Sequence, residues 1–136
     1  MALSISLAYD EAMKFLAPIT LLFFALAQPV TAQSYKAGSR AYMTGDYTTA
    51  LKHMRPLAKQ GNRKAQKTLG WMYANSRGVA KDDVMAFGWF TVAVENGDRT
   101  AGRNLAGIEN RLNEAQLKEA RTLAKGCIKN LKSCPE

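Results

Sequence analysis

The sequence is poor in the residues that catalysis and metal binding most often use. Among its 136 residues, histidine occurs once, as His53, and cysteine occurs twice. His53 lies between Leu51 and Met54 on a predicted helix, without an acidic residue at helical spacing that could form an acid–base pair with it. Two cysteines and one remote histidine also lack the spacing of a zinc site. We therefore expect a non-catalytic protein with no cofactor and no metal.

Acidic residues are scarce as well, at 11 against 19 lysines and arginines, which gives a formal net charge of +8. The adjacent pair Asp82 and Asp83 comes directly before a predicted helix, where Asp82 suits the N-cap and both carboxylates complement the helix dipole. We interpret this pair as a helix start rather than a catalytic dyad. The excess of positive charge has two interpretations: it keeps the protein soluble, or it attracts an acidic partner.

No apolar run is long enough to span a bilayer. The longest run, residues 15–27, is far shorter than the roughly 20 residues that a transmembrane helix needs. Lys14 precedes this run, and the small residues Val30 and Ala32 follow it, so residues 1–32 are typical of a secretory signal peptide. We place the start of translation at Met13, directly before Lys14. The alternative is an N-terminal core helix. We expect cleavage after Ala32 and a periplasmic or secreted protein without a stable transmembrane anchor.

A spacing of 36 residues relates two parts of the remaining chain, residues 33–136. A fixed period of this length is typical of stacked helical hairpins. Small residues would let neighbouring helices approach closely, and glycine suits a helix end because it adopts a left-handed conformation without a steric penalty. The residues Ala50, Leu51, Met54, Gly61, Ala65, Leu69 and Met72 recur as Ala86, Phe87, Phe90, Gly97, Ala101, Leu105 and Ile108.

The same pattern predicts where the helices lie. Apolar side chains fall at helical spacing between the glycines, and Asn62 and Asp98 follow the glycines as suitable N-caps. Asn113 is expected to cap the last helix. The loop between residues 76 and 82 is predicted to be exposed and basic, with Val79 tucked between helices. The predicted helices are residues 34–44, 47–60, 63–76, 83–96, 99–111 and 114–129.

Residues 65–101 carry a longer motif that resembles the Sel1-like repeat, a tetratricopeptide-like αα-hairpin family. Its positions are Ala65, Leu69, Gly70, Tyr73, Gly78, Asp82, Ala86, Trp89, Gly97 and Ala101. The chain departs from the family at Ser76, where a glycine is common. The tetratricopeptide repeat itself is less similar, because its period is about 34 residues and its second helix lacks the tryptophan.

The resemblance implies an all-α fold in which αα hairpins stack into a solenoid that binds other proteins as an adaptor or scaffold. Residues 37–64 are similar to a partial earlier copy, and the helix at 114–129 has the polar outer face of a terminal cap. One domain, residues 33–136, would therefore hold about two and a half repeats.

Basic residues recur at equivalent positions in these repeats. Lys36, Lys67 and Arg103 form one set, and Arg63 and Arg99 form another. Equivalent residues line up along a solenoid, so we expect a basic stripe on the first helix of each hairpin, on the concave face. Trp71 lies within this stripe, either as an aromatic anchor for a partner or as a core residue.

The stripe predicts a partner protein with an acidic surface. The alternative is an anionic cell-envelope polymer or lipopolysaccharide, whose binding would depend steeply on salt. Nucleic acid would also suit a basic stripe, but export makes it an unexpected partner in vivo.

Cys127 and Cys134 are predicted to form a disulfide, because an even pair in an exported domain most simply forms a bond. On one continuous helix, two residues seven apart are separated by about 10.5 Å along the axis, beyond the roughly 7 Å between Cα atoms that a disulfide spans. The last helix must therefore break between them, with residues 130–133 as the reversal. A redox site would usually have the closer Cys-x-x-Cys spacing.

Overall fold

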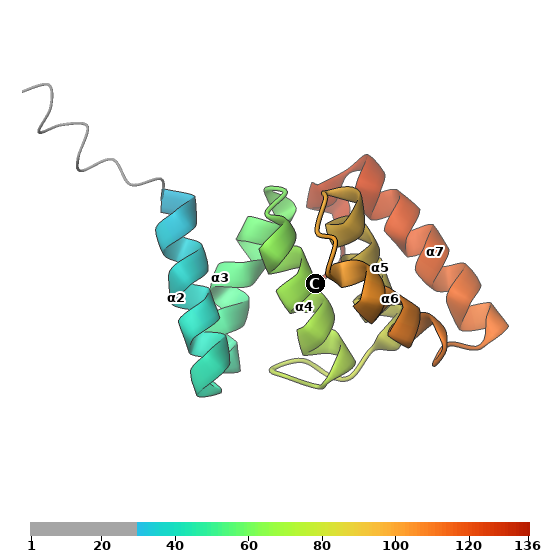
Figure 1. Ribbon diagram of the computed structural model, residues 1–136, viewed down its shortest axis with the longest axis horizontal. Coiled ribbons are helices and arrows are strands. Elements are labelled where there is room, and N and C mark those ends of the chain that lie inside the picture. The colour runs from blue at the N-terminus through green and yellow to red at the C-terminus, as the bar shows by residue number, and fades with distance from the viewer. Residues whose placement is uncertain (1–29) are drawn as a thin grey trace, which may run out of the picture. The chain divides into compact units, whose positions relative to one another are not determined.

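The computed structural model describes residues 30–136, which are helical and contain no strand (Figure 1). The predicted signal peptide therefore lies outside the described residues except for its last three. These three begin the first described helix, which continues without a break past Ala32. The helices are α2 (Val30–Thr44), α3 (Tyr47–Lys59), α4 (Arg63–Ala74), α5 (Asp83–Glu95), α6 (Ala101–Glu109), α7 (Glu114–Lys129) and the short 3-10 helix η1 (Leu131–Ser133).

All six predicted helices are present, and α7 has the predicted bounds. Asn62, Asp82 and Asn113 cap their helices as predicted, each accepting a hydrogen bond from the backbone N–H three residues later, and Asp46 does the same for α3. One such cap is worth about 1 kcal/mol. The predicted start of α6 at residue 99 is wrong by two residues, because Asp98 accepts hydrogen bonds from the N–H groups of Thr100 and Ala101 in a turn that precedes the helix.

The turns after α3 and α5 have the same structure. Gly61 and Gly97 have φ angles of +89° and +84°, in the left-handed region that glycine adopts most readily. The backbone hydrogen bonds of the two turns also recur at the 36-residue spacing: the N–H of Asn62 bonds to the carbonyl of Leu57, and that of Asp98 to Ala93. The 36-residue period of the sequence is therefore also a period of the backbone.

Small residues lie where the helices pack. Four alanines, one from each of α3, α4, α5 and α6, are fully buried: Ala50, Ala65, Ala86 and Ala101. In α4, Gly70 faces Phe90 so closely that a Cβ atom at position 70 would lie 2.7 Å from two atoms of the phenyl ring. Between α2 and α3, Gly38 faces His53 in the same way. The helices of these two hairpins therefore approach closely because side chains are small or missing at the contact.

Helix α5 is the centre of the core. Six consecutive residues, from Met85 to Phe90, are buried, and a helix that is apolar on all sides must be covered on all sides. It packs against α4, α6 and α7. At the contact between α5 and α7, Leu123 meets Gly88, and Ala120 and Ala124 are buried. The predicted apolar stripe of α7 is confirmed as its packing face, and the role of α7 as a terminal cap stays a prediction.

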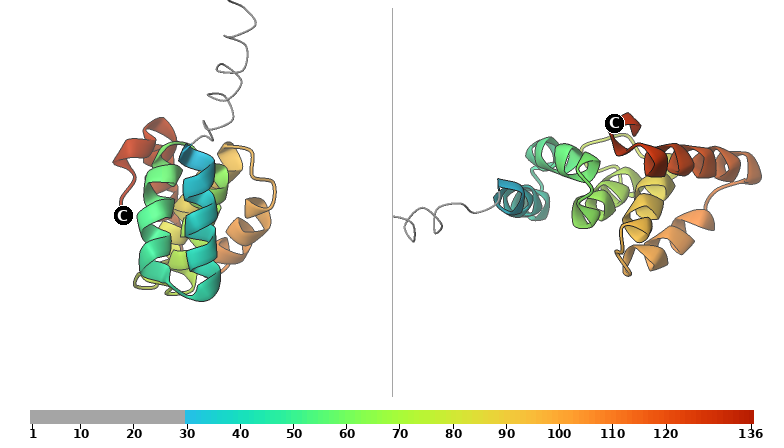
Figure 2. Two further views of the ribbon diagram at one scale, coloured as in Figure 1. Left: turned by 90° about the vertical axis from the view of Figure 1, so that its left-hand side faces the viewer. Right: turned by 90° about the horizontal axis from the view of Figure 1, so that it is seen from above.

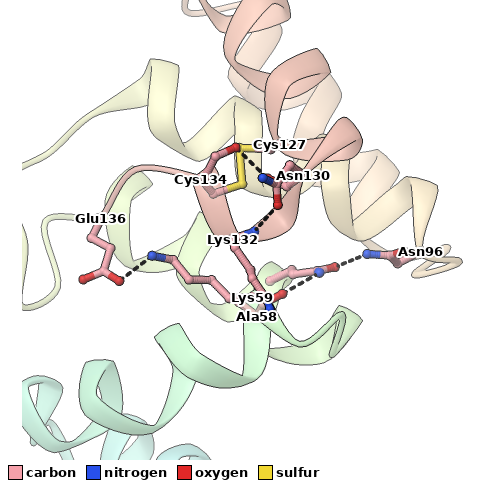
Figure 3. Close-up of a disulfide and its surroundings, with 10 residues drawn as sticks. Ala58, Lys59, Asn96, Cys127, Asn130, Lys132, Cys134 and Glu136 are labelled. Carbon is pink, nitrogen blue, oxygen red and sulfur yellow. Dashed lines mark hydrogen bonds and ion pairs between the residues drawn. A yellow bond between two sulfur atoms is a disulfide. The ribbon is translucent and has the colours of Figure 1, made fainter.

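Gln66 is a fully buried polar residue that connects three helices. Its Nε2 donates to the carbonyl of Ala58 at the end of α3 (2.9 Å), and its Oε1 accepts from Nδ2 of Asn96 at the end of α5 (2.9 Å). The two ends of this connection, Ala58 and Asn96, are labelled in Figure 3. Because a buried amide without partners is costly, Gln66 fixes the positions of α3, α4 and α5 relative to one another.

One prediction for the loop between α4 and α5 is wrong. Val79 packs against the core as predicted, but Arg77 is half-buried rather than exposed. Its Nη1 donates to the hydroxyl of Tyr42 at 2.6 Å, and its guanidinium lies 5.2 Å from the ring of Tyr42 and 5.9 Å from that of Tyr47. Arg77 thus fastens the loop to the turn between α2 and α3, which Figure 2 shows side by side.

Cys127 and Cys134 form the predicted disulfide, and the helix breaks where predicted. Helix α7 ends at Lys129, the chain turns through η1, and the two Cα atoms are 4.9 Å apart. The segment after the disulfide reaches α3, where Lys59 Nζ lies 2.6 Å from Glu136 Oε1 (Figure 3). The disulfide therefore holds the C-terminal segment against a helix more than 70 residues away in sequence.

Replacing Gly70 with alanine tests the close approach of α4 and α5. We expect Gly70→Ala to lower the free energy of unfolding by about 1 to 3 kcal/mol, because the methyl group would displace the Phe90 ring. The matched control is Gly107→Ala in α6, where a Cβ meets nothing within 4 Å and alanine favours the helix by up to about 1 kcal/mol. Denaturant unfolding followed by circular dichroism measures both, and equal shifts would contradict the packing argument.

Removing the disulfide tests its contribution to stability. The double variant Cys127→Ser/Cys134→Ser is expected to lose about 2 to 3 kcal/mol of unfolding free energy, from the entropy of closing so short a loop. Adding a reductant to the unaltered protein should cause a similar loss, while the double variant should not respond. A denaturation midpoint that is the same with and without the bond would show that the disulfide does not stabilise this fold.

Candidate functional site

The residues that could have suggested catalysis have structural roles. His53 is half-buried, and its Nδ1 lies 3.1 Å from the hydroxyl of Ser34 on α2. Asp82 caps α5, and Asp83 lies 3.8 Å from Lys81 and 3.7 Å from Arg111. The interpretation of this acidic pair as a helix start is thus confirmed. Among residues 30–136 no three His, Cys, Asp or Glu side chains gather as metal ligands would, and no helix is long and apolar enough to cross a membrane.

The predicted binding residues lie on three helices and one turn. Lys36 is exposed on α2, Arg63 and Lys67 begin α4, Arg99 lies in the turn before α6, and Arg103 is exposed on α6. The structure brings part of this set together around the turn at residues 97–100. Lys67 contacts that turn directly, and a Cβ atom at Gly97 would lie 3.5 Å from Nη1 of Arg63. Cations of α4 therefore do lie beside the start of α6.

Lys67 also forms an ion pair within the fold, which its position in the repeat does not predict. Its Nζ lies 3.1 Å from Asp98 Oδ2 and donates to the hydroxyl of Thr100 at 2.7 Å. Asp98 is buried, so the ion pair joins α4 to the beginning of α6. Much of the positive charge of Lys67 is therefore compensated within the fold, whereas Arg63, Arg99 and Arg103 have exposed side chains.

Asp98 is held ionised by this cluster. Burial by itself raises the pKa of the carboxyl group, but the hydrogen bond from Thr100, the hydrogen bond and charge of Lys67, and the N–H of Ala101 outweigh it. The net effect is a pKa below the ordinary value of an aspartate. The carboxylate is thus the acceptor around which the turn and Lys67 are arranged.

Trp71 is partly a core residue and partly a surface residue. Its ring packs edge-on against Phe90, with the ring centroids 5.8 Å apart and the planes at 88°, yet 39% of the residue is exposed. The core alternative therefore holds for the part of the ring that packs against Phe90, and the role of the exposed part as an anchor for a partner stays a prediction. On the same side of α4 lies Lys64, two helical turns earlier.

Lys64 and Tyr35 were missed as candidates. Lys64 Nζ lies 5.9 Å from the ring centroid of Tyr35 on α2, an arrangement that favours a cation–π interaction. The contact places α2 beside the exposed face of α4. A signal for Lys64 existed in the sequence, because it lies seven residues before Trp71 and so on the same face of a helix; Tyr35 had no comparable signal.

Replacing Asp98 tests the cluster through its pH dependence. Because the pKa is lowered in the folded state, the carboxylate stabilises the fold above the ordinary value of about 3.9 and loses this effect as the pH falls below it. We expect Asp98→Asn to cost about 1 to 2 kcal/mol at pH 7 and progressively less in acid. The control is Glu95→Gln, an exposed residue of α5. Denaturation curves between pH 7 and pH 3 measure this, and a cost independent of pH would contradict it.

The chain matches no protein-family model and no curated protein. The resemblance of residues 65–101 to the Sel1-like repeat therefore stays a prediction.

Proposed function

We propose that this chain is a non-catalytic, exported adaptor whose Sel1-like αα hairpins stack into a short solenoid and hold a partner protein against a basic face. The observation that carries the proposal is the recurrence of the turns after α3 and α5, with the same positive φ angles at Gly61 and Gly97 and the same backbone hydrogen bonds. Identical turns that follow equivalent helices would repeat one hairpin geometry along a stack.

Export is supported by one observation. The disulfide between Cys127 and Cys134 is compatible with an oxidising compartment. The domain that acts outside the cytoplasm would then be residues 33–136.

The basic stripe is the proposed binding surface. Lys36, Arg63, Arg99 and Arg103 have exposed side chains, and Trp71 is partly exposed. In a stack of equivalent hairpins these residues would form one continuous stripe. A surface of one charge sign attracts a partner of the other sign and accelerates its binding. A partly exposed tryptophan with a fixed ring is a suitable anchor at the centre of a protein interface.

An anionic envelope polymer is the second candidate, and the net charge of +8 favours it. A polymer recognised by charge alone would lose its affinity steeply as salt increases, without dependence on an aromatic side chain. A protein partner would depend on salt and also on the apolar contacts.

Crosslinking in living cells tests the proposed function. An affinity-tagged chain is crosslinked, purified and analysed for attached protein, glycan and lipopolysaccharide. We expect a defined protein, whose recovery falls at least fivefold in the variant Lys36→Glu/Arg63→Glu/Arg103→Glu. Lys67 is left unchanged, because a glutamate there would face Asp98 and destabilise the turn.

The matched control reverses three exposed cations of α7, in the variant Lys118→Glu/Lys125→Glu/Lys129→Glu. It changes the net charge by the same amount and should retain the partner. Equal losses in the two variants would exclude the stripe as the binding surface. Recovery of glycan or lipopolysaccharide instead of a protein would favour the second candidate.

A further inference from the structure

The positive charge of the compact unit is concentrated in its first half. Residues 34–81 contain ten lysines and arginines and one acidic residue, Asp46. Residues 82–136 contain eight lysines and arginines and eight acidic residues. The excess charge therefore belongs to α2, α3, α4 and the loop after α4, whereas α5, α6 and α7 are neutral as a group.

Internal ion pairs compensate few of these ten cations. Within residues 30–136 three of them lie in an ion pair, namely Lys59 with Glu136, Lys67 with Asp98 and Lys81 with Asp83. The acidic residue of this half, Asp46, is used as the N-cap of α3. The other seven cations form no ion pair with the residues that the structure describes, and two of them, Lys64 and Arg77, lie over aromatic rings.

Two helices of this half present cations and apolar side chains together. On α2, Lys36, Arg40 and Met43 are exposed at positions i, i+4 and i+7, which lie on one side of a helix. On α4, Lys64 and Trp71 are exposed and also lie seven residues apart. These five residues are called the α2–α4 surface below.

The contact of Lys64 with Tyr35 joins the two parts of this surface. Tyr35 precedes Lys36 on α2, and Lys64 Nζ lies 5.9 Å from the Tyr35 ring. The cations of the two helices therefore lie near one another rather than on opposite sides of the domain. Helices α2 and α4 contain no acidic residue that would weaken their combined positive potential.

The α2–α4 surface also holds two of the three large apolar side chains that are exposed within residues 30–136. Met43 is 82% exposed and Trp71 is 39% exposed, while the third, Ile128, lies on α7. Methionine, tryptophan and arginine are enriched at protein interfaces, whereas lysine is depleted there. Apolar side chains among cations suit a peptide that carries both acidic and apolar groups.

We infer that an acidic segment of a partner protein, with apolar side chains among its carboxylates, docks on Lys36, Arg40, Met43, Lys64 and Trp71, and that α7 lies outside this contact. This inference rests on the proposed function and specifies where on the chain the partner binds and with what chemistry. Charge complementarity selects the acidic residues of the segment, and the exposed Met43 and Trp71 select its apolar residues. A pure polyanion would make no use of those two side chains.

Fluorescence anisotropy with two labelled peptides tests the inference. The first probe is a 20-residue peptide of alternating pairs of glutamate and leucine, and the second has the same number of glutamates with serine in place of leucine. Each is titrated with the full, oxidised protein. We expect the leucine-containing probe to bind at least tenfold more tightly than the serine-containing probe.

Paired variants locate the binding surface. Arg40→Glu/Lys64→Glu is expected to weaken the binding of the leucine-containing probe at least tenfold. The matched variant Lys118→Glu/Lys125→Glu reverses two exposed cations of α7, with the same change in charge, and should weaken it less than threefold. Met43→Ser should weaken the binding of that probe about fivefold without changing the unfolding midpoint, because the side chain is almost fully exposed. Circular dichroism confirms that each variant is folded.

Three outcomes would overturn the inference: equal losses in the two paired variants, no effect of Met43→Ser, or equal affinity for the two probes. The last would point to recognition of a polyanion by charge alone. These outcomes differ from a failure of the proposed function, in which crosslinking in cells recovers no protein. If a protein is captured in cells but is lost equally from both paired variants, the adaptor function stands, and the α2–α4 surface is excluded as its binding site.

Discussion

The structure depends on how closely neighbouring helices can approach. At the contacts between α2 and α3 and between α4 and α5, glycines face a large side chain of the partner helix, and a single added Cβ would overlap it. Four fully buried alanines on α3 to α6 have the same effect. Close approach places Phe90 against Gly70 and Trp71, and so sets how far the indole extends into solvent. The presentation of the candidate surface is therefore a consequence of residues that have almost no side chain.

Interactions between residues distant in sequence then fix the relative positions of helices and loops, which packing alone would leave adjustable. Gln66 joins the ends of α3 and α5, Lys67 joins α4 to the turn before α6, and Arg77 joins the loop after α4 to the first turn. The disulfide holds the C-terminal segment where Glu136 reaches Lys59. Three of these connections use cations of the basic half, namely Lys59, Lys67 and Arg77, so only part of the formal charge of that half is available to a partner.

The fold could be predicted from the sequence to the extent that local chemistry determines it. Gly61 and Gly97 mark helix ends because few other residues adopt their backbone conformation, and Asn62, Asp82 and Asn113 mark starts because their side chains accept the first N–H groups. The break between Cys127 and Cys134 follows from helix geometry. Ser76, where the resembled family has glycine, has a φ of +54°, so the loop keeps the backbone that glycine would favour.

The candidate site was less predictable, because its properties depend on contacts between distant residues. The repeat places Lys67 and Arg103 at equivalent positions, but it does not show that Asp98 compensates the charge of Lys67. Nor does an amphipathic pattern show whether Trp71 is covered, since that depends on the position of Phe90. Arg77 looked like a surface residue because the tyrosines that enclose it lie about 30 or more residues earlier in the sequence.

The buried amide of Gln66 has a mechanical consequence. The position equivalent to Gln66 one period later is Gly102, which has no side chain to connect neighbouring helices in this way. Helices α6 and α7 are linked instead by the exposed pair Glu109 and Arg121, an interaction worth less than about 1 kcal/mol. We therefore expect the contact between α6 and α7 to open more easily under a bending force than the contacts among α3, α4 and α5, which Gln66 connects.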